Sequence, residues 1–154
     1  MITSLAYLGI NSPHKDEWPR MASDFWGAMV TEPGPDGAVR IKFDEALWRI
    51  QIHDGEHDET AYLGWGVDRE EDLDDIADVL AGLGVVAERG DAELAEARGV
   101  NRILVFTDPW GFRHEVTWGQ SAVASTFRPG RPISGFVTGQ QGLGHVLLLM
   151  PDIE

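Results

Sequence analysis

The residues of this chain that could carry catalytic or metal-binding chemistry are its five histidines and its carboxylates, because the 154-residue sequence contains no cysteine. The lack of Cys excludes disulfides, thiolate nucleophiles, iron–sulfur clusters and Cys-ligated zinc. Four histidines fall at expected loops or strand ends, namely His14, His53, His57 and His114. The fifth, His145, follows Gly-Leu-Gly and precedes an apolar run. A lone histidine beside an apolar strand is more often packed and hydrogen-bonded than a ligand, so both roles stay open.

Acidic residues gather in two stretches that could attract a cation. In the first, two histidines lie among four acids, namely His53, His57, Asp54, Glu56, Asp58 and Glu59. Four-residue spacing in a loop gives no fixed ligand geometry, so only a stray cation is expected there. In the second, Asp68 to Asp78 holds seven acids and one Arg. The helix dipole favours acids in the first turns, so this stretch predicts a solvated helix start, with calcium binding as the weaker alternative.

The overall charge excludes several classes of partner. Twelve Lys and Arg against 26 Asp and Glu leave a formal net charge of −14, which repels phosphate backbones and anionic membranes. The amino terminus has no basic region, and the apolar runs are too short to span a bilayer. The 43% apolar and 25% charged content is that of a globular chain. We therefore expect a soluble cytoplasmic protein that binds neither nucleic acid nor membrane.

Hydrophobic periodicity predicts two amphipathic helices and six strands. The helix that starts within Asp68 to Asp78 has an expected buried stripe of Leu73, Ile76, Ala77, Leu80 and Leu83. A helix over Glu17 to Val30 has a stripe of Trp18, Met21, Ala22, Phe25 and Met29. The expected strands are Leu5 to Ile10, Ala38 to Phe43, Trp48 to His53, Ala61 to Val67, Asn101 to Phe106 and Arg113 to Trp118. A tight turn at Asp108 to Gly111 separates the last two.

An internal repeat with an offset of 55 residues organises these elements. Ala6-Tyr7-Leu8-Gly9 recurs as Ala61-Tyr62-Leu63-Gly64. The same offset brings the two helices into phase, pairing Trp18 with Leu73, Ala22 with Ala77 and Gly27 with Gly82. The agreement of helix phase and glycine position favours a duplicated module over chance. Each module consists of a strand, a helix and about three further strands.

A third, partial copy of the module lies at the end of the chain. Leu143 to Pro151 aligns with Leu5 to Pro13 at an offset of 138, with His145 in place of Tyr7. The preceding stretch, Gln120 to Gly142, is rich in Gly, Pro and Ser, as interdomain connections are. We therefore predict a paired domain over 1–119, with modules of about 1–60 and 61–119, then a linker over 120–142. The first strand of another domain would occupy 143–154.

Four stretches of the sequence carry a resemblance to a known family: Leu5 to Ile10, Trp48 to Val67, Phe106 to Gly111 and Gly135 to Asp152. With them the chain resembles the two-domain type I extradiol ring-cleavage dioxygenases, which include 2,3-dihydroxybiphenyl 1,2-dioxygenase-like enzymes. They are part of the vicinal oxygen chelate superfamily, also called glyoxalase/bleomycin resistance/dioxygenase. The last stretch is the most specific, because it resembles the family's junction between its amino-terminal and carboxy-terminal domains.

The resemblance implies an α+β fold in which two βαβββ modules per domain form an open, incomplete barrel. It also implies that the amino-terminal domain is metal-free, whereas the carboxy-terminal domain holds Fe(II), less often Mn(II), through two His and one Glu. Residues 143–154 would then be the first strand of a truncated catalytic domain. His145 matches the first of these metal ligands, and the other two would lie beyond residue 154. No catalytic residue and no bound cofactor is expected within this chain alone.

The superfamily's ligand positions in the first pair of modules correspond to Tyr7, Tyr62 and Glu115. Neutral phenols are poor Fe(II) ligands, so we expect a metal-free domain in which Glu115 is a structural or surface acid. The implied parent protein is a homo-oligomer that opens catechol-type diols with O2, and the 154-residue chain alone would be inactive. A metal-free, ligand-binding protein of the bleomycin-resistance type remains the alternative. A glyoxalase-like metal lyase or isomerase is weakened by the two tyrosines.

Overall fold

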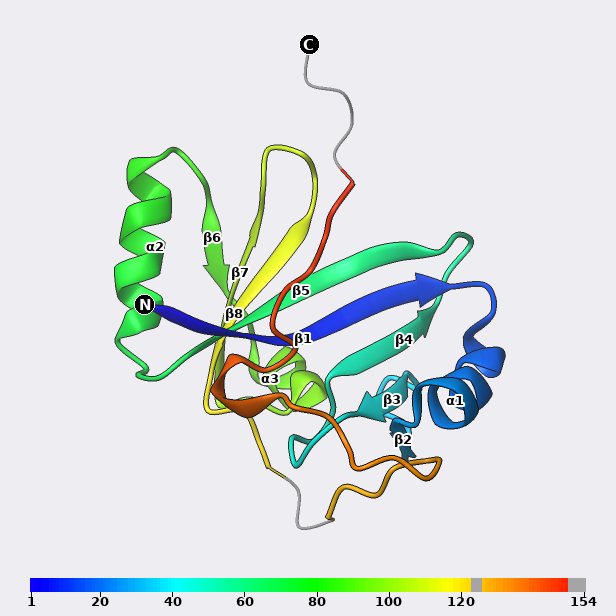
Figure 1. The fold of residues 1–154 in the computed structure, drawn as a ribbon. Helices are drawn as coiled ribbons and strands as arrows, with labels where there is room; N and C mark the ends of the chain where they lie inside the picture. Colours follow the sequence, from blue (N-terminus) through cyan, green and yellow to red (C-terminus); the bar gives the residue numbers. More distant parts are fainter. Residues whose placement is uncertain (123–125, 150–154) are drawn as a thin grey trace.

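A single eight-stranded sheet organises the chain in a computed structural model that describes residues 1–122 and 126–149 (Figure 1). The strands follow the order β2-β3-β4-β1-β5-β8-β7-β6. Their bounds are β1 Ile2–Ser12, β2 Met29–Thr31, β3 Val39–Lys42, β4 Ile50–Asp54, β5 Glu59–Val67, β6 Ala87–Arg89, β7 Arg102–Thr107 and β8 Arg113–Trp118. No helix in these described ranges is long and apolar enough to cross a membrane.

The strand order confirms the duplicated module. β1, the first helical segment and β2 to β4 form one βαβββ unit, and β5, α2 (Asp72–Gly82) and β6 to β8 form the other. In both units the first strand pairs in parallel with the last, β1 with β4 and β5 with β8. The antiparallel pairing of β1 with β5 joins the two units at the centre of the sheet. Since β2 and β6 are the two ends of the order and do not pair with each other, the α+β fold is an open, incomplete barrel.

The repeated Ala-Tyr-Leu-Gly sequence has a packing explanation. Antiparallel pairing sets Tyr7 opposite Gly64 and Tyr62 opposite Gly9. Each phenol ring therefore lies over the glycine of the other module, where a Cβ atom would collide with ring carbons. The duplicated pair of residues thus fixes how closely β1 and β5 approach, and it explains why Tyr and Gly recur together.

The first predicted helix is shorter than expected and faces a different way. It consists of η1 Lys15–Glu17, α1 Trp18–Arg20 and the π-helical turn η2 Met21–Trp26, and ends at Gly27, which is left-handed with φ 81°. A π-helical turn closes hydrogen bonds between residues i and i+5, so the positions that face the core differ from those of an α-helix. Here Trp18, Ala22 and Trp26 pack inward. Met21 and Phe25 are instead 41% and 70% exposed. The predicted stripe through Met21, Phe25 and Met29 was therefore wrong.

The second predicted helix, α2, starts within the acidic stretch, as expected, and packs against its own module. Leu73 is fully buried and forms a core cluster with Val67, Leu104 and Val116. Three further residues of the helix pack on this cluster, namely Ile76, Ala77 and Leu80. Asp72 Oδ2 accepts a hydrogen bond from the backbone N–H of Arg69, which closes the turn that leads into α2. Leu83 is 74% exposed because the helix ends at Gly82, so its place in the predicted stripe was wrong.

Four short elements were missed in the sequence: β2, β6, the helix α3 (Ala92–Arg98) and the 3-10 helix η3 (Gly139–Gln141). The first two are three-residue strands at the ends of the sheet. The third is a seven-residue helix with Asp91 as its N-cap, whose side chain accepts from the N–H of Leu94, and with a left-handed Gly99 at its end. Segments this short show too little periodicity to be recognised.

The stretch predicted as a linker is packed along the first module where it is described. The N–H of Leu47 donates to the carbonyl of Ser121, and that of Gly130 to the carbonyl of Gly27. The ring of Phe136 lies 4.9 Å from that of Phe43. After Gly142 the N–H of Leu143 donates to the carbonyl of Leu5, and the Leu143 side chain packs on the core of the first module. The part of the predicted final strand that is described, 143–149, is not in a strand; residues 150–154 lie outside the described ranges.

The Tyr-over-Gly contacts generate a test of the central strand pair. Replacing Gly9→Ala places a methyl group against the Tyr62 ring, and overpacking of this kind costs about 1–3 kcal/mol. Urea unfolding should show a lower midpoint for this variant. Gly82→Ala is the matched control, because its added Cβ meets nothing within 4 Å and Ala suits a helix better than Gly. Equal midpoints for Gly9→Ala and the native chain would contradict the packing role.

Candidate functional site

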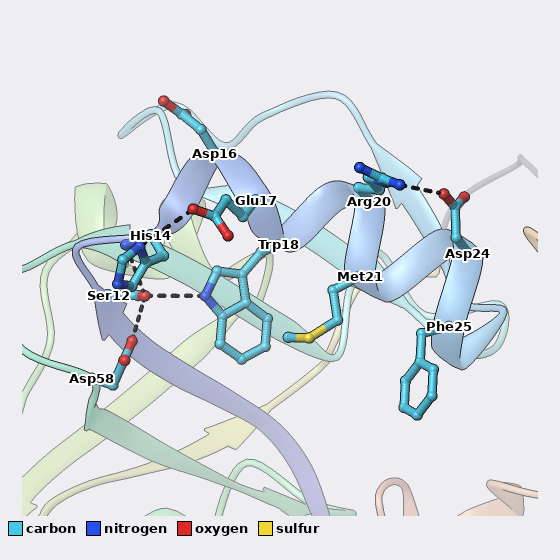
Figure 2. Close-up of a pocket in the computed structure, with 10 residues that line it drawn as sticks. All are labelled: Ser12, His14, Asp16, Glu17, Trp18, Arg20, Met21, Asp24, Phe25 and Asp58. Atoms are coloured by element: carbon cyan, nitrogen blue, oxygen red, sulfur yellow. Dashed lines mark hydrogen bonds and ion pairs between the residues drawn. The ribbon is translucent and has the colours of Figure 1, made fainter.

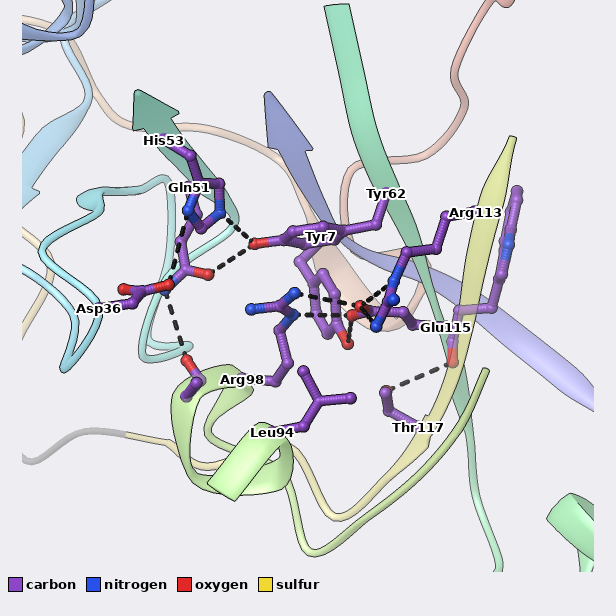
Figure 3. Close-up of polar contacts among 12 residues, drawn as sticks. Tyr7, Asp36, Gln51, His53, Tyr62, Leu94, Arg98, Arg113, Glu115 and Thr117 are labelled. Carbon is purple, nitrogen blue, oxygen red and sulfur yellow. Dashed lines mark hydrogen bonds and ion pairs between the residues drawn. The ribbon is translucent and has the colours of Figure 1, made fainter. Parts of the chain in front are cut away.

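Where the two modules meet, the sheet gathers a buried polar cluster (Figure 3). Tyr7 and Tyr62 come from the two central strands, β1 and β5, and Gln51 and Glu115 from the flanking strands, β4 and β8. All four side chains belong to residues that are at most 3% exposed. The fifth member, Arg98, enters from the end of α3 and is 7% exposed.

The two halves of the cluster follow the same construction. Gly64, opposite Tyr7, is the parallel neighbour of Glu115, and Gly9, opposite Tyr62, is the parallel neighbour of Gln51. Each phenol reaches across the glycine of the adjacent strand to the polar residue on the strand beyond. Tyr7 Oη donates to Glu115 Oε2 at 2.8 Å, and Tyr62 Oη donates to Gln51 Oε1 at 2.7 Å. The halves differ in charge, because one ends in a carboxylate and the other in an amide.

The carboxylate of Glu115 is satisfied by two guanidinium groups. Arg98 donates from Nε to Oε2 at 2.8 Å and from Nη2 to Oε1 at 3.1 Å. Arg113 donates from Nε to Oε1 at 3.0 Å from the more exposed side. The Arg98 guanidinium also stacks on Tyr62, with Cζ 3.8 Å from the ring centroid. Glu115 is fully buried, so it is a structural acid and the surface alternative was wrong.

The surroundings of this cluster fix its protonation states. Burial, followed by the charge of Glu115, raises the pKa of the Tyr7 phenol well above its usual value. Burial likewise raises the pKa of Tyr62, although Arg98 acts in the opposite direction. Burial, the largest influence, would lower the pKa of Arg98, but the hydrogen bond to Glu115 and the electrostatic interactions with Glu115 and the two tyrosines together outweigh it, so the pKa of the guanidinium is raised. The cluster therefore holds neutral phenols around a permanent cation.

His53 extends the cluster toward the surface. Its Nε2 lies 2.8 Å from Tyr62 Oη, and its Nδ1 lies 3.5 Å from Asp36 Oδ2. Since Tyr62 Oη donates to Gln51, a protonated Nε2 completes the hydrogen bond. Burial lowers the pKa of His53, partly offset by the negative charge of Asp36. The neutral imidazole is thus the form that the folded chain favours.

The cluster does not fit a ferrous ion. The three positions that the resemblance makes ligands are Tyr7, Tyr62 and Glu115, and both phenols are neutral donors whose hydroxyl hydrogens are already used. Both oxygens of Glu115 are occupied by arginine nitrogens. Across residues 1–122 and 126–149, no three or more His, Asp or Glu side chains gather as a metal site. No step of a reaction can therefore be assigned to iron at this cluster.

The other sequence-predicted residues are dispersed. His145 is exposed in an extended segment. His53 and His57 do not act together, because His53 points to Tyr62 whereas His57 is exposed in the loop after β4. His114 Nδ1 accepts from the indole of Trp65, and its Nε2 lies 3.1 Å from Asp108 Oδ2 in the predicted turn. Arg98 and Gln51 were missed, and no motif in the sequence marks either of them.

A second candidate is a hollow of about 730 Å³ beside α1 (Figure 2). Trp18, Met21 and Phe25 line it, and exposed acids such as Asp16 and Asp24 surround them. The buried hydroxyl of Ser12 accepts from Trp18 Nε1 at 3.1 Å and donates to Asp58 Oδ1 at 2.5 Å. The volume suits a small molecule, but this buried polar group is already paired within the chain.

Comparison with known proteins places this geometry in a fold class. The chain is 36% identical over 154 residues to biphenyl-2,3-diol 1,2-dioxygenase of Paraburkholderia xenovorans, covering 99% of this chain and 51% of that protein. It is 32% identical to 1,2-dihydroxynaphthalene dioxygenase of Pseudomonas sp. strain C18, covering 99% of this chain and 51% of that protein. A crystal structure of BphC, a halotolerant catechol dioxygenase, matches with a TM-score of 0.94 at 43% identity, covering 99% of this chain and 51% of that one. No model of a protein family matches.

The fold is therefore that of the vicinal oxygen chelate proteins, as the resemblance implied. Within that class, the homologues of this chain are extradiol dioxygenases, which confirms the recognised family. The chain spans about half the length of the curated relatives it matches.

The depressed pKa of His53 predicts a pH dependence of folding stability. Below the ordinary histidine value of about 6.5, the unfolded chain gains a proton that the folded chain resists, so stability falls from pH 7 to pH 5. One proton taken up only by the unfolded chain changes the free energy of unfolding by at most roughly 1.4 kcal/mol per pH unit. His53→Gln should therefore reduce the slope of stability against pH by part of that amount. Urea midpoints at several pH values measure the slope, with the exposed His57→Gln as control. An unchanged slope in His53→Gln would exclude His53 as the source.

Proposed function

We propose that this chain is the amino-terminal, metal-free portion of an Fe(II)-dependent extradiol dioxygenase that cleaves catechol-type diols with O2. The observation that carries the proposal is the alignment of 99% of the chain with half of enzymes named for this reaction. The proposed partners of the whole protein are a catechol-type small molecule, O2 and further copies of itself. A cytoplasmic location stays part of the prediction.

The chemistry of the buried cluster supports a structural role for this portion. Tyr7, Gln51, Tyr62, Arg98 and Glu115 satisfy one another, so the meeting point of the modules offers no open ligand position. Iron, when bound in the parent, would supply the joint binding of diol and O2. This portion would instead provide a rigid sheet against which the catalytic portion folds.

The position of His145 is compatible with the proposed first iron ligand. The imidazole is exposed, just after the segment tied to β1 by the Leu143–Leu5 hydrogen bond. A single imidazole does not hold Fe(II) usefully, and the remaining ligands of the proposed site would come from beyond residue 154. Manganese is the alternative metal.

The test compares the chain with a chimera. The purified 154-residue chain, supplied with Fe(II), should take up no oxygen with 2,3-dihydroxybiphenyl or 3-methylcatechol. The same chain extended with the complementary half of the Paraburkholderia xenovorans relative should take up oxygen in proportion to its bound iron. His145→Ala in the chimera should lower both iron content and oxygen uptake by at least tenfold.

The relative itself serves as the positive control, and the His14→Ala chimera is the matched histidine control, because His14 is an exposed residue between β1 and η1. Iron-dependent oxygen uptake by the isolated chain would overturn the proposal. Tight binding of an aromatic ligand by the isolated chain without iron would instead favour the bleomycin-resistance type of function.

A further inference from the structure

The cation at the meeting point of the modules comes from a helix that has no counterpart in the first module. Within the described residues, α3 lies between β6 and β7 of the second module, whereas no helix lies between β2 and β3 of the first. Its last residue, Arg98, is delivered between the two modules (Figure 3). The duplicated residues Tyr7 and Tyr62 thus surround a group that has no counterpart in the other module.

The contacts of Arg98 are those by which proteins bind a guanidinium ligand. Two of its nitrogens form a fork to the Glu115 carboxylate at 2.8 and 3.1 Å, and its Cζ atom lies 3.8 Å from the centroid of the Tyr62 ring. Paired hydrogen bonds to a carboxylate and stacking on an aromatic face are the two preferred modes for this cation. Tyr7 Oη donates to Glu115 Oε2, the oxygen that also accepts from Arg98 Nε, and so helps to orient the carboxylate toward the guanidinium.

The end of α3 is anchored so that the guanidinium is presented to this pocket. The carbonyl of Ala97 accepts from Arg40 Nη2 at 3.1 Å and from Gln51 Nε2 at 3.4 Å. The carbonyl of Gly99 accepts from the N–H of Ser121 at 2.8 Å. These contacts on either side of Arg98 are made by other segments, so the position of the end of α3 does not depend on the Arg98 side chain alone.

The structure assigns Tyr7, Tyr62 and Glu115 to a pocket for a guanidinium-type cation, which the chain fills with its own Arg98. The cation held at the three ligand positions that the resemblance implies is therefore a side chain and not a metal ion. Arg98, at the end of α3, therefore acts as an internal ligand that fills the pocket between the two modules. This inference concerns residues of this chain only and does not depend on the proposed function.

The first test asks whether the pocket requires a cation. Arg98→Lys keeps the positive charge, whereas Arg98→Met keeps most of the length and leaves Glu115 with Arg113 alone. The urea midpoint of Arg98→Lys should therefore lie between those of the native chain and Arg98→Met. A midpoint of Arg98→Met equal to or above that of Arg98→Lys would overturn the inference.

The second test asks whether the pocket accepts the free ligand. Arg98→Ala should be stabilised by millimolar guanidinium or methylguanidinium at constant ionic strength. At ten times the dissociation constant, the folding equilibrium constant rises about tenfold, which raises Tm by about 3–5 °C. Tetramethylammonium, which carries the same charge but donates no hydrogen bond, should give no such rise.

The controls separate this pocket from general salt effects. The native chain and the double variant Arg98→Ala/Glu115→Gln should not be stabilised by guanidinium, because one has no vacant pocket and the other has no carboxylate. Equal responses of the native chain and Arg98→Ala would overturn the inference. A rise in Tm with Mn(II) and none with guanidinium would also overturn it, since the vacated pocket would then be a metal site.

Discussion

The burial of one carboxylate, that of Glu115, is the constraint on which the centre of this protein depends. A charge removed from water must be compensated by paired charges and hydrogen bonds, and loss of one partner of such a pair costs about 3–5 kcal/mol. Here Arg98, Arg113 and the phenol of Tyr7 supply that compensation. Because these groups come from α3, β8 and β1, the single acid links the inserted helix, the second module and the first.

The duplicated strands place the paired residues, and the two modules differ in the charge of the side chains that they place there. Tyr7 over Gly64 and Tyr62 over Gly9 form equivalent contacts across the central strands. One phenol ends on a carboxylate and the other on the amide of Gln51, so only one half requires a cation. The second module supplies it through α3. A symmetric backbone thus supports an asymmetric interior, because a single pair of substituted side chains changes the local charge without changing the register.

This arrangement is consistent with the proposed division of labour in a longer dioxygenase. A central cluster in which the phenols, Glu115 and Arg98 satisfy one another has little capacity to bind substrate or metal. The segment after residue 126 runs along the first module and is tied to β1 at Leu143 before His145. In the proposed parent, this attachment to β1 would set where that histidine enters the catalytic portion.

The sequence by itself determined the six main strands, the α2 start, the duplicated module and the family, because these depend on periodicity, local turn chemistry and repeated residues. It also marked Tyr7, Tyr62 and Glu115 as corresponding positions. Only the tertiary structure decided that Phe25 faces outward, since a π-helical turn changes the helical phase. It alone paired Glu115 with Arg98, 17 residues apart, because strand pairing and the end of α3 bring them together. A pattern along the chain carries no record of such a contact, since its partners share neither a period nor a motif.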